Sequence, residues 1–230
     1  MHGADRTDTG VTVHRFGREA EPVVQIDDYS GMADELLARG RSATYQPGGA
    51  MYPGLRSLWQ PDYLDRKGAL MVQIMQQVFG VQEGVKVESC AFSMVCTPAG
   101  ELTPPQRIPH YDDTGGEVLA IMHYLLGPET GGTAFYRHRR TGFETITPQR
   151  EATFSAAVAE DEREYGPPAA GYYYGDTDRY EKIGEIEARP DRLIVYRGRL
   201  LHSGVIPLPG ALTADPAEGR LTINMFLIAR

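Results

Sequence analysis

The chain has 230 residues, of which 41% are hydrophobic, and a formal net charge of −8. This length and composition suit one globular domain with a sizeable core, and they exclude a small disulfide-stapled scaffold. An acidic chain is repelled by phosphate backbones and anionic lipids, so nucleic acid and membranes are not expected partners. The 26 glycines and 16 prolines favour short strands joined by turns over a helical bundle.

Two cysteines, Cys90 and Cys96, are too few for a disulfide framework. They lie in one predicted strand, and a rise of about 3.3 Å per residue would place them roughly 20 Å apart, too far to bridge each other. Free thiols are typical of a reducing compartment. Residues 1–21 lack a signal-peptide pattern, and no apolar run approaches the ~20 residues of a membrane span, so we expect a cytoplasmic protein.

Residues 1–20 show little apolar pattern and are predicted to form a flexible N-terminal arm. One domain is expected to follow at residues 21–230. Its first strand is predicted at residues 22–26, and Ser30 is a plausible N-cap of a short helix that ends at Gly40.

The dense Gly and Pro residues between positions 41 and 60 predict a loop. Apolar residues at helical spacing then predict a second helix at residues 61–79. After this helix the pattern changes to short strands, interrupted by a polar helix at residues 151–165 and a tyrosine-rich loop at residues 171–175. The expected strands cover residues 85–96, 117–126, 133–138, 183–188, 193–196, 200–206 and 221–228.

Early helices followed by many short strands favour a mainly β fold with flanking helices. The expected core is a double-stranded β-helix, or cupin-like jelly roll, at about residues 85–228, with the N-terminal helices packed outside it.

Metal-binding side chains occur in two segments of this core. Residues two apart on an extended segment point to the same side, so His110 and Asp112 can bind one ion. His202 lies in an apolar strand and would be a third ligand. Two histidines and one carboxylate form the facial triad of non-haem Fe(II), which leaves three coordination positions open. Taken singly, a solvated His–Asp pair and a satisfied core histidine are the simpler interpretations.

The last predicted strand opens with a possible carboxylate-binding pair. Arg220 and Thr222 share one face of this strand. A guanidinium and a hydroxyl on one face can grip a carboxylate together, because the planar Arg fork binds both of its oxygens. A solvated arginine at the entrance of a strand is the alternative interpretation.

The order His-x-Asp, His, Arg-x-Thr resembles the Fe(II)/2-oxoglutarate-dependent dioxygenases. More narrowly, it resembles the prolyl 4-hydroxylase-like branch and its small bacterial dioxygenase-like group. The segment Ile121–Leu126 is similar to a family strand that ends in Tyr-Leu-Asn. Residues 131–135, Gly-Gly-Thr-Ala-Phe, are similar to Gly-Gly-x-Thr-x-Phe with one residue missing. The likeness spans about residues 85–228.

This resemblance implies roles for the singled-out residues. The three metal ligands would hold Fe(II), which 2-oxoglutarate chelates through its C1 carboxylate and keto oxygen before O₂ reacts. The distal carboxylate of 2-oxoglutarate would bind Arg220, helped by Thr222 and by the hydroxyl of Tyr124. The spacing from His202 to Arg220 is longer than usual in this branch, and residues 207–219, rich in Pro, Gly and Ala, account for it as a loop insertion.

Asp112 also bears on the reaction, because halogenating relatives have a small residue in place of this carboxylate. We therefore expect oxidation of an unactivated C–H by hydroxylation, desaturation or ring closure, and no halogenation. The chain has no recognisable peptide- or nucleic-acid-binding module, which favours a small-molecule substrate. The favoured class is an amino acid or an amino-acid-derived intermediate of a specialised biosynthetic pathway. Candidates to meet its carboxylate are Arg56, Arg107, Arg137 and His138.

Two other functions are compatible with these residues. The same three ligands could hold Zn²⁺ in a hydrolase with an open water position, although Arg220, Thr222 and Tyr124 would then have no role. A jelly roll that binds a ligand without catalysis is the third possibility, because a fold does not by itself confer function. The sequence leaves the oligomeric state open, with a homodimer as one alternative.

Overall fold

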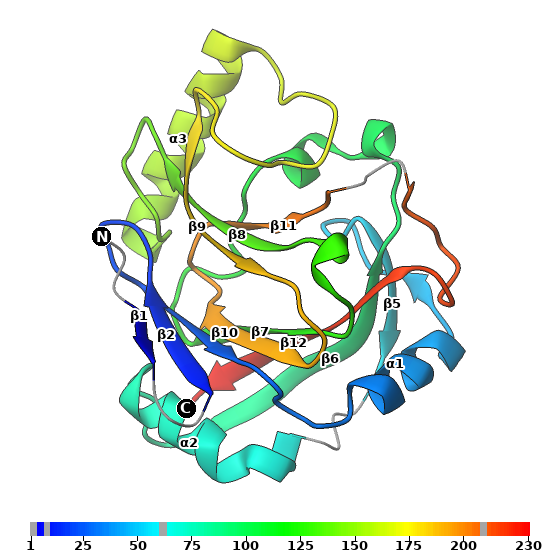
Figure 1. Cartoon of the computed structure of the whole chain (residues 1–230). Helices are drawn as coiled ribbons and strands as arrows, with labels where there is room; N and C mark the ends of the chain where they lie inside the picture. Colours follow the sequence, from blue (N-terminus) through cyan, green and yellow to red (C-terminus); the bar gives the residue numbers. More distant parts are fainter. Residues whose placement is uncertain (1–3, 7–9, 60–63, 208–210) are drawn as a thin grey trace.

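The computed structural model describes residues 4–6, 10–59, 64–207 and 211–230. Two antiparallel sheets form its core, one above the other in Figure 1. The nine-stranded sheet has the order β1-β2-β3-β10-β7-β12-β6-β5-β4, and the three-stranded sheet has the order β11-β8-β9. This architecture confirms the predicted mainly β jelly roll with flanking helices.

The strands are β1 (Ala4–Arg6), β2 (Val11–Arg15), β3 (Pro22–Ile26), β4 (Gln46–Pro47), β5 (Gly54–Leu58), β6 (Val85–Val95), β7 (Val118–Tyr124), β8 (Gly132–His138), β9 (Tyr180–Glu187), β10 (Arg192–Arg197), β11 (His202–Val205) and β12 (Arg220–Ala229). The α-helices are α1 (Ala33–Ser42), α2 (Gly68–Gln77) and α3 (Pro148–Tyr165). Short 3₁₀ helices are η1 (Leu64–Lys67), η2 (Ala99–Glu101), η3 (Pro104–Arg107) and η4 (Pro128–Thr130).

The outer face of the larger sheet packs against α1 and α2 (Figure 1). Alternate residues of β12, namely Leu221, Ile223 and Met225, join Leu36 of α1 and Met75 of α2 in one buried cluster. Removing this apolar surface from water, at about 25 cal/mol per Å², is the main force that holds the helices on the sheet.

The inner face of the larger sheet packs against the smaller sheet. Ala120 and Tyr124 of β7 share a buried cluster with Phe135 of β8 and Ile183 of β9. Because strand residues alternate between faces, each central strand serves both clusters. The interior between the sheets is therefore lined by every second residue of β7, β12 and β6.

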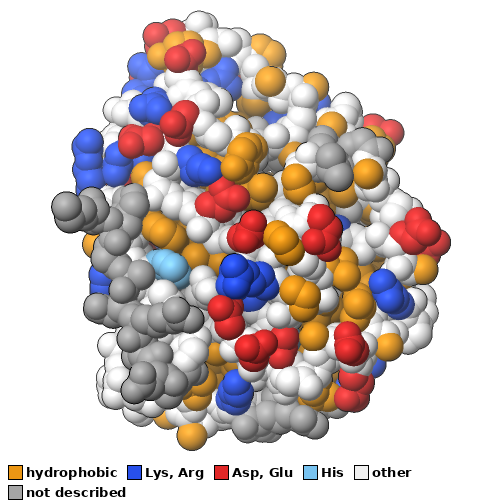
Figure 2. Space-filling model, viewed as in Figure 1, with side chains coloured by type: hydrophobic (Ala, Val, Ile, Leu, Met, Phe, Trp, Pro, Cys, Tyr) orange, Lys and Arg blue, Asp and Glu red, His pale blue; other side chains and the backbone are white. Residues whose placement is uncertain are grey.

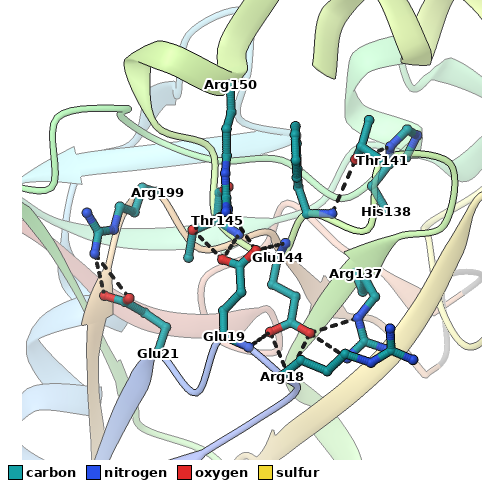
Figure 3. A network of polar contacts seen from close by, with 11 residues as sticks. Arg18, Glu19, Glu21, Arg137, His138, Thr141, Glu144, Thr145, Arg150 and Arg199 are labelled. Atoms are coloured by element: carbon teal, nitrogen blue, oxygen red, sulfur yellow. Dashed lines mark hydrogen bonds and ion pairs between the residues drawn. The ribbon is translucent and has the colours of Figure 1, made fainter. Parts of the chain in front are cut away.

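The structure differs from the expected flexible arm at residues 11–20. β2 pairs with β3 along its whole length, from Val11 opposite Ile26 to Arg15 opposite Pro22. A network of ion pairs and hydrogen bonds then anchors the residues after β2 to the barrel (Figure 3). The ordering comes from these contacts with distant parts of the chain, which the local apolar pattern does not report.

The loop expected at residues 41–60 is also wrong in part, because it contains β4 and β5. β5 pairs with β6, and Gly54 lies opposite Val95. A Cβ at Gly54 would lie 2.0 Å from the carbonyl oxygen of Met94. This glycine therefore permits a close approach between two strands, and it does not mark a loop.

The predicted helices form with different ends. α1 starts after Met32, whose N–H donates to the hydroxyl of Ser30 at 3.0 Å, so Ser30 lies before the N-cap. Gly40 lies within α1, where a Cβ would be 3.0 Å from the Phe92 ring, so it permits close packing instead of ending the helix. The second predicted helix is observed as η1 and α2, and its first three residues lie outside the described part. The polar helix, α3, starts three positions earlier than predicted, at Pro148.

Acidic, basic and apolar side chains are interspersed on the face of the molecule drawn in Figure 2. Among the described helices, none is both long and apolar enough to cross a membrane.

Candidate metal centre

The structure brings together three side chains that lie far apart in the sequence. One ligand atom from each of His110, Asp112 and His202 lies within 4.8 Å of the other two. Nε2 of His202 is 3.6 Å from Oδ2 of Asp112, and Nε2 of His110 is 3.9 Å from Oδ1 of the same carboxylate. Both separations exceed hydrogen-bond length, so the three side chains face one another without forming hydrogen bonds between these atoms.

Backbone hydrogen bonds fix this arrangement. His110 and His202 form an antiparallel bridge, in which the N–H of each donates to the carbonyl of the other at 2.9 Å. The N–H of Asp112 donates to the carbonyl of Gly198 at 2.7 Å. Gly198 lies in the connection between β10 and β11, and His202 begins β11. One stretch of chain therefore supplies a ligand and positions the other two.

The protonation states of the three groups suit a divalent cation. Nδ1 of His202 donates to the carbonyl of Leu200 at 2.8 Å, which leaves Nε2 directed toward Asp112. Desolvation lowers the pKa of His110 and of His202 to about 4. Burial raises the pKa of Asp112 to about 6, against the opposing charges of His110 and Arg56. At neutral pH both imidazoles are neutral and the carboxylate is ionised, as metal binding requires.

Tyr196 of β10 borders these three residues. Its ring meets the ring of His202 edge to face with centroids 4.8 Å apart, and that of Phe135 at 5.3 Å. Burial raises the pKa of Tyr196 well above its usual value, and Asp112 and Tyr124 raise it further. Tyr196 therefore links the metal ligand His202 to the buried cluster that contains Tyr124.

A row of polar residues crosses the inner face of the larger sheet. Arg56 of β5 lies opposite Ser93 of β6. Thr222 of β12 lies opposite both Ser93 and Tyr124 of β7. Directly opposite residues share a face of the sheet, and Tyr124 belongs to the cluster between the sheets. All four side chains therefore face the interior, where the Tyr124 and Thr133 hydroxyls form a 2.7 Å hydrogen bond.

Arg220 shares this face with Thr222, two residues further along β12. It is 9% exposed, and its Nε donates to the carbonyl of Thr130 at 2.6 Å. Its Nη2 lies 3.4 Å from the carbonyl of Gly132. No carboxylate among the described residues pairs with this guanidinium, so it is available to an anionic ligand.

Three tyrosines interact electrostatically with Arg220. Burial lowers the pKa of Arg220, and Tyr52, Tyr124 and Tyr172 oppose this shift. Tyr172 comes from the tyrosine-rich loop, and its hydroxyl donates to the carbonyl of Thr97 at 2.7 Å. Tyr52 and Tyr172 both lie outside the helices and strands, so no local pattern assigns either of them to this site.

The remaining candidates for a substrate carboxylate differ in their surroundings. Nε of Arg107 donates to a backbone carbonyl at 2.8 Å. Arg137 is buried in ion pairs with two carboxylates, and buried His138 bonds to Asp161 at 2.8 Å. These three side chains therefore bind other groups of the protein itself. Arg56, by contrast, has a buried Nε with no hydrogen-bond partner among the described residues.

A sequence-family profile described as a family of unknown function (DUF6445) matches residues 7–227. No curated protein matches the chain significantly.

The fold is similar to that of solved oxygenase structures. The non-heme alpha ketoglutarate dependent epimerase SnoN from nogalamycin biosynthesis aligns with a TM-score of 0.51 and 13% identity, covering 91% of this chain and 79% of SnoN. HygX from Streptomyces hygroscopicus, solved with nickel and 2-oxoglutarate bound, aligns with a TM-score of 0.51 and 12% identity, covering 92% of this chain and 84% of HygX. This likeness confirms the predicted fold of the 2-oxoglutarate-dependent oxygenases.

Proposed function

The chain belongs to the DUF6445 family, and we propose that it is a non-haem Fe(II)/2-oxoglutarate-dependent oxygenase. The observation that carries this proposal is the meeting of two imidazoles and one carboxylate within 4.8 Å. This donor set suits Fe(II) and leaves three coordination positions for further ligands. The fold shared with SnoN and HygX supports the same class of chemistry.

His110, Asp112 and His202 would hold the metal. The hydrogen bond from Nδ1 of His202 to Leu200 keeps Nε2 unprotonated and holds the ring in place. The backbone bond from Asp112 to Gly198 fixes the start of the carboxylate side chain. The ligands are therefore arranged before the ion arrives, so that metal binding costs little reorganisation.

Arg220 would hold the distal carboxylate of 2-oxoglutarate, since a guanidinium binds both oxygens of a carboxylate. Thr222 and Tyr124 share the inner face with it and would donate hydroxyl hydrogen bonds. When bound, Fe(II) and 2-oxoglutarate supply the oxidation by O₂ of a substrate C–H, with release of succinate and CO₂. The apolar cluster between the sheets would limit water around this site.

We propose a small molecule as the substrate, namely an amino acid or an amino-acid-derived intermediate of a biosynthetic pathway. SnoN has been solved with the small molecule nogalamycin RO and alpha ketoglutarate together, which supports a small-molecule substrate. Because Asp112 retains its carboxylate, the expected reactions are hydroxylation, desaturation or ring closure, and not halogenation.

The test is anaerobic titration of the protein with Fe(II) and 2-oxoglutarate, followed through the visible charge-transfer band of their chelate. Wild-type protein should form the band, and His110→Ala and His202→Ala should abolish it. Arg220→Gln should form the band only at about tenfold or more higher 2-oxoglutarate, because a charge-assisted hydrogen bond contributes about 1.5–3 kcal/mol.

Wild-type protein that binds Zn²⁺ but forms no Fe(II)–2-oxoglutarate band would contradict the proposal and favour a hydrolase. Unchanged demand for 2-oxoglutarate in Arg220→Gln would contradict the role of Arg220 alone.

A further inference from the structure

Arg56 is a second inward-facing guanidinium, besides Arg220, that no carboxylate neutralises. It lies opposite Ser93 on the inner face of the larger sheet. Its Nε is buried and lacks a hydrogen-bond partner among the described residues. An unpaired buried donor costs about 1–3 kcal/mol, so its retention calls for a compensating ligand.

The buried arginines outside this site have different surroundings. Buried Arg137 is paired with two carboxylates, and buried Arg192 with Asp27 at 2.5 Å. The chain has 31 acidic residues, so carboxylates are not scarce. Arg56 and Arg220 are the inward-facing arginines of the described chain that have only neutral neighbours within bonding distance.

The Arg56 side chain is also held in one orientation. Its guanidinium carbon lies 4.1 Å from the centroid of the Tyr52 ring, in a cation–π contact. The aromatic ring covers one face of the guanidinium and leaves its edge, where the N–H donors lie, open to a planar anion. Arg56 lies on the same inner face as Thr222 and Tyr124, with Ser93 between Arg56 and Thr222. Tyr124 shares a buried cluster with Tyr196, whose ring contacts His202, so this face leads to the metal ligands.

The two guanidiniums come from different strands of the larger sheet. Arg56 is on β5 and Arg220 on β12, with β6 between them. Burial raises the pKa of Tyr52, and the charges of Arg220 and Arg56 both oppose this shift. One dicarboxylic cosubstrate needs one of these groups for its distal carboxylate, because its other end chelates the metal. The second guanidinium is then available to a different anion.

We propose that Arg56 forms a carboxylate subsite for the primary substrate, beside the metal and separate from the 2-oxoglutarate subsite at Arg220. This inference rests on the proposed oxygenase function and narrows its substrates to molecules with a carboxylate near the oxidised carbon. Arg56 is then a specificity-determining residue, and Tyr52 positions it.

The subsite can be probed without knowing the substrate. Trifluoroacetate is a small carboxylate whose ¹⁹F relaxation is enhanced near a paramagnetic ion. The protein is loaded with Mn(II), which binds the same donor types, and saturated with 2-oxoglutarate, so that Arg220 is occupied. Wild-type protein should enhance ¹⁹F relaxation saturably, and the same titration with Zn²⁺ provides the diamagnetic baseline.

Arg56→Gln should weaken trifluoroacetate binding about tenfold or more, while changing the 2-oxoglutarate dissociation constant less than about twofold. Arg56→Lys should retain part of the affinity, because it keeps the charge but loses the planar fork. Arg41→Gln removes the same charge from an exposed position on α1 and should behave as wild type.

Two results would overturn the subsite. One is trifluoroacetate relaxation that is absent in wild type or unchanged in Arg56→Gln. The other is an Arg56→Gln variant that loses 2-oxoglutarate affinity as Arg220→Gln does, which would make Arg56 a cosubstrate ligand. A wild-type protein that forms no Fe(II)–2-oxoglutarate band refutes the oxygenase function, and the subsite falls with it.

Discussion

Glu19 and Glu144 hold each other through reciprocal hydrogen bonds (Figure 3). The backbone N–H of Glu19 donates to the carboxylate of Glu144 at 2.8 Å, and the backbone N–H of Glu144 donates to the carboxylate of Glu19 at 3.2 Å. The Glu144 carboxylate also accepts from Arg137 at 2.8 Å, and that of Glu19 from Arg150 at 2.7 Å. The two residues are 125 positions apart in the sequence, and their hydrogen bonds join the N-terminal segment to the barrel.

Glu144→Gln is expected to lower the free energy of unfolding by about 2–3 kcal/mol, because several charge-assisted hydrogen bonds to one buried carboxylate are weakened. Chemical denaturation measures this change. Glu160→Gln is the matched control, because the Glu160 side chain is 52% exposed and its carboxylate lies 3.8 Å from Arg140, beyond hydrogen-bond length. Loss of this exposed ion pair should cost less than about 0.5 kcal/mol. Equal losses in both variants would show that the reciprocal pair does not anchor the segment.

Gly17→Ala should weaken the same junction from its other side. Gly17 has φ +68°, and a Cβ there would lie 2.3 Å from the Glu144 carboxylate. The variant therefore combines left-handed strain of about 1–2 kcal/mol with displacement of the carboxylate. Gly142→Ala is the control, with φ +73° and nothing within 4 Å. Thermal denaturation should show a larger loss for Gly17→Ala, and the excess should disappear when both are tested in the Glu144→Ala background, which removes the side chain that the new Cβ would meet.

The apolar pattern predicted most of the central strands, because each buries residues on one or both faces and so carries a periodic signal. β6, β7 and β8 each overlap a predicted strand. The pattern did not predict β5, where Gly54 permits a close approach of strands, or β2, which is ordered by pairing with β3. Both depend on partners that are distant in sequence.

The residues of the candidate site also differ in whether the sequence could predict them. The i, i+2 spacing of His110 and Asp112 is visible locally, whereas His202 is singled out by its place in the order of motifs that resembles the dioxygenases. The structure places the three side chains together. Tyr52 and Tyr172 could not be predicted, because a tyrosine in a loop carries no signal of what it will face. Long-range contacts bring those loops to Arg220, and only the folded chain shows them.

Asp191 should give the stability of the protein an acid-sensitive component. Burial alone would raise the pKa of Asp191, but hydrogen bonds from His123, Ser30 and Gly31 hold it well below its usual value. The unfolded chain has a pKa near 3.9 at this position, so the stabilisation is complete above about pH 4 and is lost as the pH falls further.

Asp191→Asn should therefore be less stable than wild type at neutral pH by about 2 kcal/mol and should lose less stability on acidification below pH 4. Asn tolerates the left-handed conformation of this residue, whose φ is 60°, so the backbone need not change. Denaturant titrations from pH 7 to pH 3 measure the difference. The exposed Asp34→Asn controls for the lost charge, and parallel pH curves for Asp191→Asn and wild type would contradict the assignment.

Gly198→Ala should impair metal binding without removing a ligand. The Gly198 carbonyl accepts the hydrogen bond from Asp112, and a Cβ at Gly198 would lie 3.1 Å from Cβ of Asp112 and 3.3 Å from Cγ1 of Val118. Both distances are tighter than ordinary packing, so the side chain of Asp112 must shift by a few tenths of an ångström. Changes in the supports of metal ligands cost about 10–100-fold in affinity, and a tenfold weaker Fe(II) constant is expected.

Gly204→Ala is the matched control, because it lies on β11 beyond His202 and its Cβ would meet nothing within 4 Å. Anaerobic Fe(II) titration should give wild-type affinity for Gly204→Ala and reduced affinity for Gly198→Ala, with both proteins folded by circular dichroism. Equal Fe(II) affinity in the two variants would mean that the Asp112 carboxylate tolerates the displacement. The close contact at Gly198 would then have no part in shaping the metal centre.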